Sequence, residues 1–182
     1  DKDRARRLMQ SIHAPVVPGT QTLGRAEEAE ELAQKLGYPV LIKATAGGGG
    51  KGIRAAADAE QLRQLLPPAS AEAERAFGDG GVYLEKSLTG VRHVEMQILA
   101  DTFGNVVCLG ERDCSLQRNR QKILEETPCP VLPEPVRREM MDTAVRAARA
   151  AGYTNAGTVE FLLAPDGRFY FIEMNARLQV EH

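Results

Sequence analysis

The chain has 182 residues, and its 23 lysines and arginines nearly balance its 25 aspartates and glutamates, leaving a net charge of -2 at pH 7. This balance gives no overall attraction to nucleic acid or anionic membranes, and no apolar run approaches the roughly 20 residues that span a bilayer, so neither partner is expected. The three cysteines lack CxxC spacing, which argues against a disulfide framework or structural zinc site and favours a reducing compartment, the cytoplasm or, in a eukaryote, the mitochondrial matrix.

The first half of the chain predicts helices and one short strand. Gly37 suits the end of a helix because it tolerates a left-handed backbone, and Pro39 blocks any continuation. Pro67 and Pro68 are expected to break a later helical region, since proline lacks the N–H that a helix interior needs. The predicted elements are a helix at residues 1–12, a helix at 26–36, a strand at 39–43 and two short helices within 58–78.

From residue 82 onward, alternating apolar residues predict a mainly antiparallel sheet that one helix, from Pro135 to Ala151, interrupts. The fold class predicted from this order is α+β. Strands are expected at residues 82–85, 91–99, 106–109, 158–163 and 168–174. Three parts are expected along the chain: a leading helix and connector at residues 1–16, a small unit at 17–88 and a larger sheet unit at 89–182.

Four consecutive glycines, Gly47–Gly50, lie between Lys43 and Lys51. The segment can be a plain flexible turn, or it can cover phosphates, because backbone N–H groups without a neighbouring Cβ approach an anion closely. A P-loop would need Ser or Thr where Gly52 stands, and a dinucleotide-binding motif would need a helix directly after the glycines. The phosphate reading therefore predicts a mobile lid, with Lys43 directed at the phosphates as a point charge.

Two carboxylates are expected to face each other in the last hairpin. If Asp166–Gly167 is a two-residue turn, Glu160 lies opposite Glu173, and Asn175 follows on the same face. Opposed like charges destabilise a strand pair unless a cation lies between them. Two carboxylates and an amide oxygen suit Mg²⁺ or Mn²⁺, whereas the plainer alternative is a solvated polar face.

The same alternation of polar and apolar residues continues past this strand. Arg177, Gln179 and Glu181 follow on the polar side. An amphipathic strand explains this pattern, but an arginine, an amide and a carboxylate together can also hold a small planar anion and remove a proton beside it.

Several segments of the chain resemble biotin carboxylases, and the likeness runs over nearly its whole length. The ending is the most specific, because related carbamoyl phosphate synthetases share the segment Glu173–Arg177 but diverge over Leu178–His182. The segments that carry the resemblance are Leu41–Arg54, Arg92–Gln97, Glu111–Gln117 and Phe171–His182.

The resemblance implies an ATP-grasp fold, with residues 17–88 as its lid, and a set of site residues. For the phosphates of ATP these are Lys2, Lys43, Gly47, Gly48, Gly49 and Gly50. Around the adenine and ribose it implies Glu85, Lys86, Leu88, Leu162, His93 and Gln117. The implied metal ligands are Glu160, Glu173 and Asn175. For bicarbonate the matching residues are Arg177, Gln179 and Val180, with Glu181 as the base and Lys43 and Arg177 as further catalytic residues.

In that family, bicarbonate attacks the γ-phosphate of ATP to give carboxyphosphate, whose breakdown delivers CO₂ to biotin. The resemblance thus implies ATP, Mg²⁺ or Mn²⁺ and biotin as cofactors, and biotin carboxyl carrier and carboxyltransferase domains or subunits as partners. Arg120 stands where the family usually has a histidine, so a phosphate or ribose contact at this position is expected to have an altered geometry. The ends of the sequence indicate a segment of a longer protein, so the chain by itself is not expected to carboxylate biotin. Two alternatives remain open, a carbamoyl phosphate synthetase-like ligase and a nucleotide-binding module without catalysis.

Overall fold

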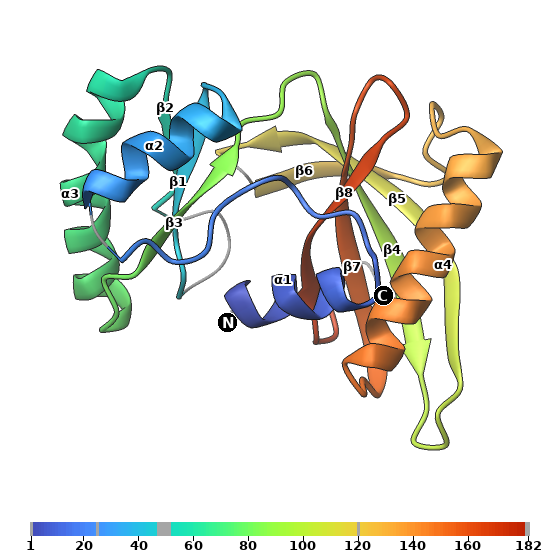
Figure 1. The fold of residues 1–182 in the computed structure, drawn as a ribbon. Helices are drawn as coiled ribbons and strands as arrows, with labels where there is room; N and C mark the ends of the chain where they lie inside the picture. Colours follow the sequence, from blue (N-terminus) through green and yellow to red (C-terminus); the bar gives the residue numbers. More distant parts are fainter. Residues whose placement is uncertain (1, 25, 47–51, 120, 181–182) are drawn as a thin grey trace. The chain divides into compact units, whose positions relative to one another are not determined.

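The computed structural model describes residues 2–24, 26–46, 52–119 and 121–180. The chain forms two compact units, shown in Figure 1. The first contains residues 17–88 with the start of the N-terminal helix, and the second contains residues 5–16 and 89–182. The helix expected in a separate leading segment, α1 (Lys2–Ser11), therefore belongs mostly to the second unit, where Met9 enters the core.

The first unit is a small antiparallel sheet with two helices. Its strands are β1 (Val40–Ala44), β2 (Arg54–Ala56) and β3 (Val82–Lys86), in the order β2-β1-β3. The helices α2 (Ala26–Leu36) and α3 (Ala59–Phe77) supply the buried residues that pack against this sheet. Ala29 and Ala33 are almost fully buried, because their small side chains let α2 approach closely.

The prediction that Pro67 and Pro68 divide a helical region in two is wrong, since α3 runs unbroken through both prolines. Its buried residues Leu62, Leu66, Ala69 and Ala73 keep helical spacing across the prolines, so one continuous face packs on the core. The ends are also well capped. The Asp58 side chain accepts the N–H of Gln61, and Gly78 ends the helix at a φ of 70°.

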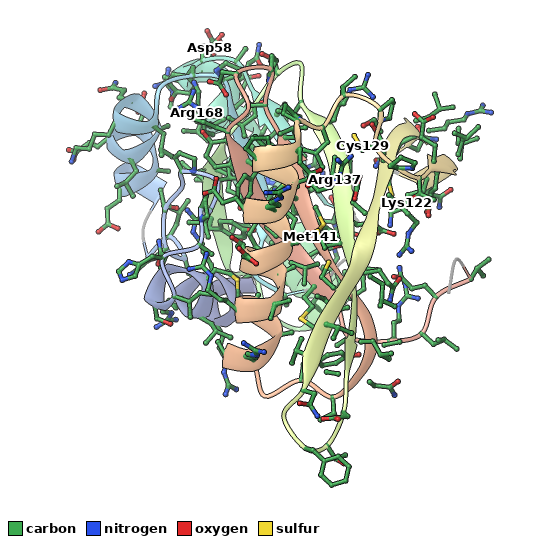
Figure 2. All side chains as sticks on the ribbon, turned by 90° about the vertical axis from the view of Figure 1, so that its right-hand side faces the viewer. Asp58, Lys122, Cys129, Arg137, Met141 and Arg168 are labelled. Carbon is green, nitrogen blue, oxygen red and sulfur yellow. The ribbon has the colours of Figure 1, made fainter. Side chains whose placement is uncertain are left out.

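The second unit is a larger antiparallel sheet in the order β6-β5-β4-β7-β8. Its strands are β4 (Arg92–Ala100), β5 (Val106–Arg118), β6 (Gln121–Glu126), β7 (Asn155–Leu163) and β8 (Phe169–Asn175). The helix α4 (Glu134–Ala150) runs along this sheet with Arg137 and Met141 on it, and it covers the apolar face together with α1 (Figure 2). No helix in the described ranges is long and apolar enough to cross a membrane.

Two strand predictions in this unit were incomplete. β5 was expected to end at residue 109 but continues to Arg118, and β6 was not predicted at all. The missed part of β5 contains Glu111, Arg112 and Asp113, and such a run of charges is typical of a loop. It forms a strand because Glu111 and Asp113 are almost fully buried and form ion pairs with Arg137 and Arg92.

The turn of the last hairpin differs from the prediction, yet the pairing beyond it agrees. The connection is one residue longer than a two-residue turn: the Ala164 N–H donates to the Arg168 carbonyl at 2.7 Å. Leu163 consequently pairs with Phe169. A bulge beside Glu160 shifts the register back by one residue, so Glu160 does lie opposite Glu173.

Candidate functional site

The face of the large sheet opposite α4 has a row of carboxylates. Glu95 on β4 pairs with Glu160 on β7, which pairs in turn with Glu173 on β8. On its other side Glu95 pairs with Arg112 of β5. Glu95 is 0% exposed and Glu160 is 5% exposed, so this row needs positive charge close by to remain ionised.

Three side chains hold the Glu160 carboxylate. His93 Nε2 lies 2.9 Å from Oε2, while Asn175 Nδ2 and Lys122 Nζ lie 2.8 and 3.1 Å from Oε1. Burial alone would raise the pKa of Glu160, but the hydrogen bond to His93 and the charge of Lys122 outweigh it and lower the pKa to about 2. Glu160 is therefore an anion at neutral pH.

Lys122 connects this carboxylate to its neighbour in the row. Its ammonium also forms an ion pair with Glu95, whose other carboxylate oxygen accepts a hydrogen bond from Arg112 Nε. Burial by itself would lower the pKa of Lys122, but the hydrogen bond to Glu95 and the charge of Glu160 raise it. Lys122 and Arg112 thus neutralise two buried carboxylates, while Arg112 also donates to Gln97 Oε1 at 2.8 Å.

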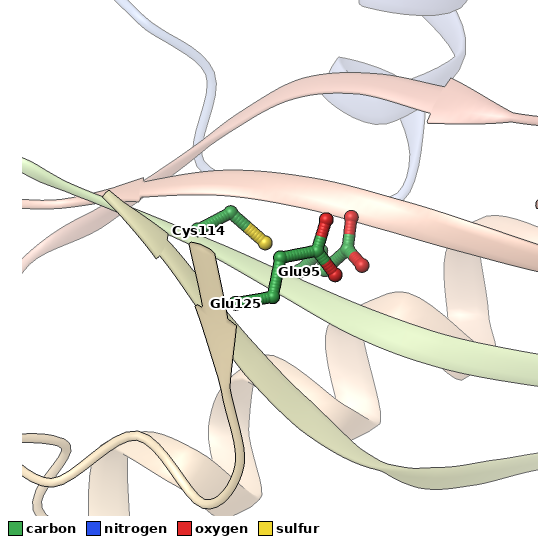
Figure 3. A group of neighbouring side chains, drawn as sticks. All are labelled: Glu95, Cys114 and Glu125. Carbon is green, nitrogen blue, oxygen red and sulfur yellow. The ribbon is translucent and has the colours of Figure 1, made fainter. Parts of the chain in front are cut away.

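A second cluster of possible metal ligands lies beside this network. Ligand atoms of Glu95, Cys114 and Glu125 lie within 4.8 Å of one another (Figure 3). Glu95 is already neutralised by Lys122 and Arg112. Burial and the nearby Glu95 raise the pKa of Cys114, so its thiol remains protonated. This set is therefore better explained as part of the charge network than as a metal site.

The predicted metal ligands Glu160, Glu173 and Asn175 come together as expected. Thr158 pairs with Asn175 two residues along from the pair of Glu160 and Glu173, on the same face of the sheet. Because a carboxylate only accepts hydrogen bonds, Asn175 must turn Nδ2 toward Glu160, and its carbonyl oxygen is the part left to bind a cation. Among the described residues, none donates a hydrogen bond to the Glu173 carboxylate. These oxygen donors fit Mg²⁺ or Mn²⁺.

His93 and Gln117, which the resemblance assigns to the ribose and the reaction centre, lie in contact with each other, and His93 also contacts Glu160. Gln117 Nε2 lies 2.6 Å from His93 Nδ1 and donates to the Cys114 carbonyl at 2.8 Å. His93 is thereby held between Gln117 on one ring nitrogen and Glu160 on the other. Leu162 of β7 is half-buried and pairs with His93 of the neighbouring strand β4.

The segment after β8 does not continue the strand, contrary to the simple alternation in the sequence. β8 ends at Asn175. Arg177 is exposed and donates to the Leu178 carbonyl at 3.3 Å, and Val180 is fully exposed. Of these predicted bicarbonate ligands, Gln179 contacts the sheet, since its Oε1 lies 2.9 Å from Thr158 Oγ1. The predicted base Glu181 lies outside the described residues.

In the first unit, Lys43 of β1 forms an ion pair with Glu85 of β3. Lys86 uses its ammonium differently, because it donates to the carbonyls of Gly37 and Tyr38 at 2.7 and 2.9 Å and so closes the end of α2. Leu88 follows β3, beyond its last residue. The loop Gly47–Gly50 lies outside the described residues, as does the side chain of Lys2.

Three residues of the charge network were not predicted as site residues from the sequence. Glu95 and Arg112 lie inside two segments that carry the family resemblance, so those segments contained a usable signal. Lys122 had none, because a lysine on an edge strand is most simply a solvated charge. Only the pairing of β6 with β5 brings it to Glu95 and Glu160.

Comparison with known proteins decides the family. The family model for the ATP-binding domain of the carbamoyl-phosphate synthase L chain matches residues 1–182. The chain belongs to this family.

Within it, the chain is similar to biotin carboxylases. It is 55% identical to biotin carboxylase 1 of Bacillus subtilis and 47% identical to the propionyl-CoA carboxylase alpha chain of Ruegeria pomeroyi, with all of this chain covered but only 41% and 27% of those proteins. The chain thus spans less than half of the length of these curated relatives.

Solved structures confirm the predicted α+β ATP-grasp fold. A biotin carboxylase from Campylobacter jejuni, 50% identical, superposes with a TM-score of 0.96 over the whole chain and 41% of its own length. The biotin carboxylase domain of 2-oxoglutarate carboxylase from Hydrogenobacter thermophilus, solved with MgADP, ADP and bicarbonate, gives 0.95 at 46% identity, with the whole of this chain and 40% of that one covered. The resemblance to biotin carboxylases is therefore confirmed, while the roles of individual site residues stay predictions.

Proposed function

We propose that this chain is the ATP-binding core of a biotin carboxylase, which uses ATP and bicarbonate to carboxylate biotin. The observation that carries the proposal is the pair Glu160 and Glu173 with Asn175 beside them, next to the ammonium of Lys122. Relatives at about half identity bear that name, and one neighbouring structure contains both MgADP and bicarbonate. The divalent cation would neutralise phosphate charge when bound at these ligands.

The proposed reaction needs two kinds of protein groups: cations around the phosphates of ATP, and residues that bind bicarbonate and remove its proton. Transfer of the γ-phosphoryl group needs positive charge around the phosphates, which Lys43 would supply with the glycine-rich loop. The bicarbonate oxygen forms a bond to the γ-phosphorus as the bond to ADP breaks, giving carboxyphosphate. Breakdown of carboxyphosphate to CO₂ and phosphate then carboxylates biotin, whose ring N–H proton is taken up by phosphate. Arg177, Gln179 and Val180 would hold bicarbonate, and Glu181 would remove its proton.

The proposal has three further parts. Mn²⁺ can replace Mg²⁺ as the divalent cation, the biotin is attached to a carrier protein, and a carboxyltransferase domain or subunit is the other partner. Such partners are supported by the names of two similar proteins: the propionyl-CoA carboxylase alpha chain is one chain of a carboxylase, and the biotin carboxylase domain of 2-oxoglutarate carboxylase is one domain of a carboxylase. Those names differ in the final acceptor, so the choice of acceptor belongs to the carboxyltransferase partner and not to this chain.

The test is release of ADP from Mg-ATP by the full-length protein, measured with and without bicarbonate and free biotin. A biotin carboxylase should require bicarbonate and be stimulated by biotin. If ADP release requires bicarbonate but its rate does not change with biotin, the result would favour the carbamoyl phosphate synthetase-like alternative. Nucleotide binding without turnover under all conditions would favour a module without catalysis, and either result would overturn the proposal.

A further inference from the structure

Thr158 lies on the polar face of the large sheet without a role in the proposed reaction. It is 0% exposed, and in the register of β7 and β8 it pairs with Asn175, next to the pair of Glu160 and Glu173. Its hydroxyl oxygen lies 2.9 Å from Gln179 Oε1 and 3.4 Å from Asn175 Nδ2. A buried hydroxyl therefore links a predicted metal ligand to a predicted bicarbonate ligand.

The direction of these hydrogen bonds follows from what each group can donate. Asn175 turns Nδ2 toward the Glu160 carboxylate at 2.8 Å, so it presents a donor to Thr158 as well. The Thr158 hydroxyl has one hydrogen, and at Asn175 it can only accept. Its own hydrogen needs an acceptor, since an unsatisfied buried donor is costly, and Gln179 Oε1 is within reach.

Because the Thr158 hydroxyl donates to Gln179 Oε1, it determines which end of the Gln179 amide faces the sheet. With Oε1 held by Thr158, the other end of the amide, Nε2, points away from the Thr158 hydroxyl. An amide nitrogen is a hydrogen-bond donor, which is the group that an anion such as bicarbonate accepts from. A flipped amide would place a second donor against the hydroxyl and leave it without an acceptor. The hydrogen bond from the Thr158 hydroxyl therefore favours one of the two orientations of the Gln179 amide.

We infer that Thr158 is a positioning residue for bicarbonate binding, which rests on the proposed function of the chain. It acts through Gln179 and not through the metal site, because the bond to Gln179 is the shorter one and Asn175 remains held by Glu160. Thr158 itself is buried behind both residues and takes no part in the chemistry.

The experiment compares Thr158→Val, which keeps the shape but removes the hydroxyl, with Thr158→Ser, which keeps the hydroxyl. Thr143→Val serves as a matched control, since Thr143 is also 0% exposed but lies on α4, where its hydroxyl oxygen accepts from Arg146 at 3.0 Å. In the full-length protein, Thr158→Val should raise the KM for bicarbonate roughly five- to tenfold. The KM for Mg-ATP should change less than about twofold. Thr158→Ser and Thr143→Val should both remain near the parent in both constants.

Two results would overturn the inference. One is a KM for bicarbonate in Thr158→Val that equals the parent value, and the other is an equal rise in the constants for bicarbonate and Mg-ATP. Crystal structures of the parent and Thr158→Val give a reading that does not depend on turnover. The Gln179 amide should keep its place in the parent and leave it in the variant. An unmoved Gln179 would also overturn the inference.

The outcome also separates this inference from the proposed function. A parent protein whose ADP release does not respond to bicarbonate would refute the proposed function, and the bicarbonate role of Thr158 with it. A parent that responds, with a Thr158→Val variant indistinguishable from it, would refute only the role of Thr158.

Discussion

Replacing Lys122 with methionine tests the charge network most directly. The variant keeps the length of the side chain but removes the cation that faces both Glu95 and Glu160. Glu95 is 0% exposed and, of the cations that the structure describes, would keep only Arg112 close by. Loss of one partner from a buried ion pair costs about 3–5 kcal/mol, and we expect about 2–3 kcal/mol here, because the Lys122 side chain is partly exposed and Arg112 remains.

The pH dependence of this loss has a definite sign. The pKa of Glu160 is about 2 in the folded protein against an ordinary value of 4.5, which corresponds to about 3 kcal/mol of stability. A lowered folded-state pKa means that this stability is present above pH 4.5 and disappears as the pH falls through about 2. Lys122 supplies part of it, so the difference between parent and Lys122→Met should be largest at pH 7 and shrink toward pH 2 to 3.

Urea denaturation at pH 7, 5 and 3, followed by far-ultraviolet circular dichroism, measures the effect. Arg149→Met is a suitable control, because Arg149 is exposed in the last turn of α4 and should change the stability by no more than about 1 kcal/mol. A loss below about 1 kcal/mol in Lys122→Met at pH 7, or a loss that is the same at pH 3, would refute the reasoning.

Three further substitutions test other parts of the site. Glu173→Gln should weaken nucleotide binding in the presence of Mg²⁺ by about tenfold, with little change in Tm, and calorimetry with and without Mg²⁺ would show it. Gly157→Ala should lower the stability by about 1–3 kcal/mol, because a Cβ there would lie 2.7 Å from the Asn175 carbonyl oxygen; an unchanged Tm would contradict this close packing. Arg137→Met should cost about 2 kcal/mol in urea denaturation, since it leaves the buried Glu111 carboxylate without its guanidinium partner at 2.9 Å.

The sequence by itself determined the local elements and much of the candidate site. Apolar spacing correctly predicted α1, α2 and α4, because an amphipathic helix needs only the periodicity of its own residues. The opposition of Glu160 and Glu173 was also predicted and is confirmed. That success was partly fortunate, since the longer turn and the bulge at Glu160 changed the register in opposite directions.

Only the tertiary structure shows where the burial of side chains overrides the secondary-structure preference of the local sequence. Pro67 and Pro68 remain inside α3 because the helix has a continuous buried face to preserve. The charged end of β5 forms a strand because partners distant in sequence, such as Arg137, neutralise its buried carboxylates. Lys122 belongs to the candidate site for the same reason. Strand pairing joins residues far apart in the chain, and the free energy of a buried charge depends on neighbours that no local pattern specifies.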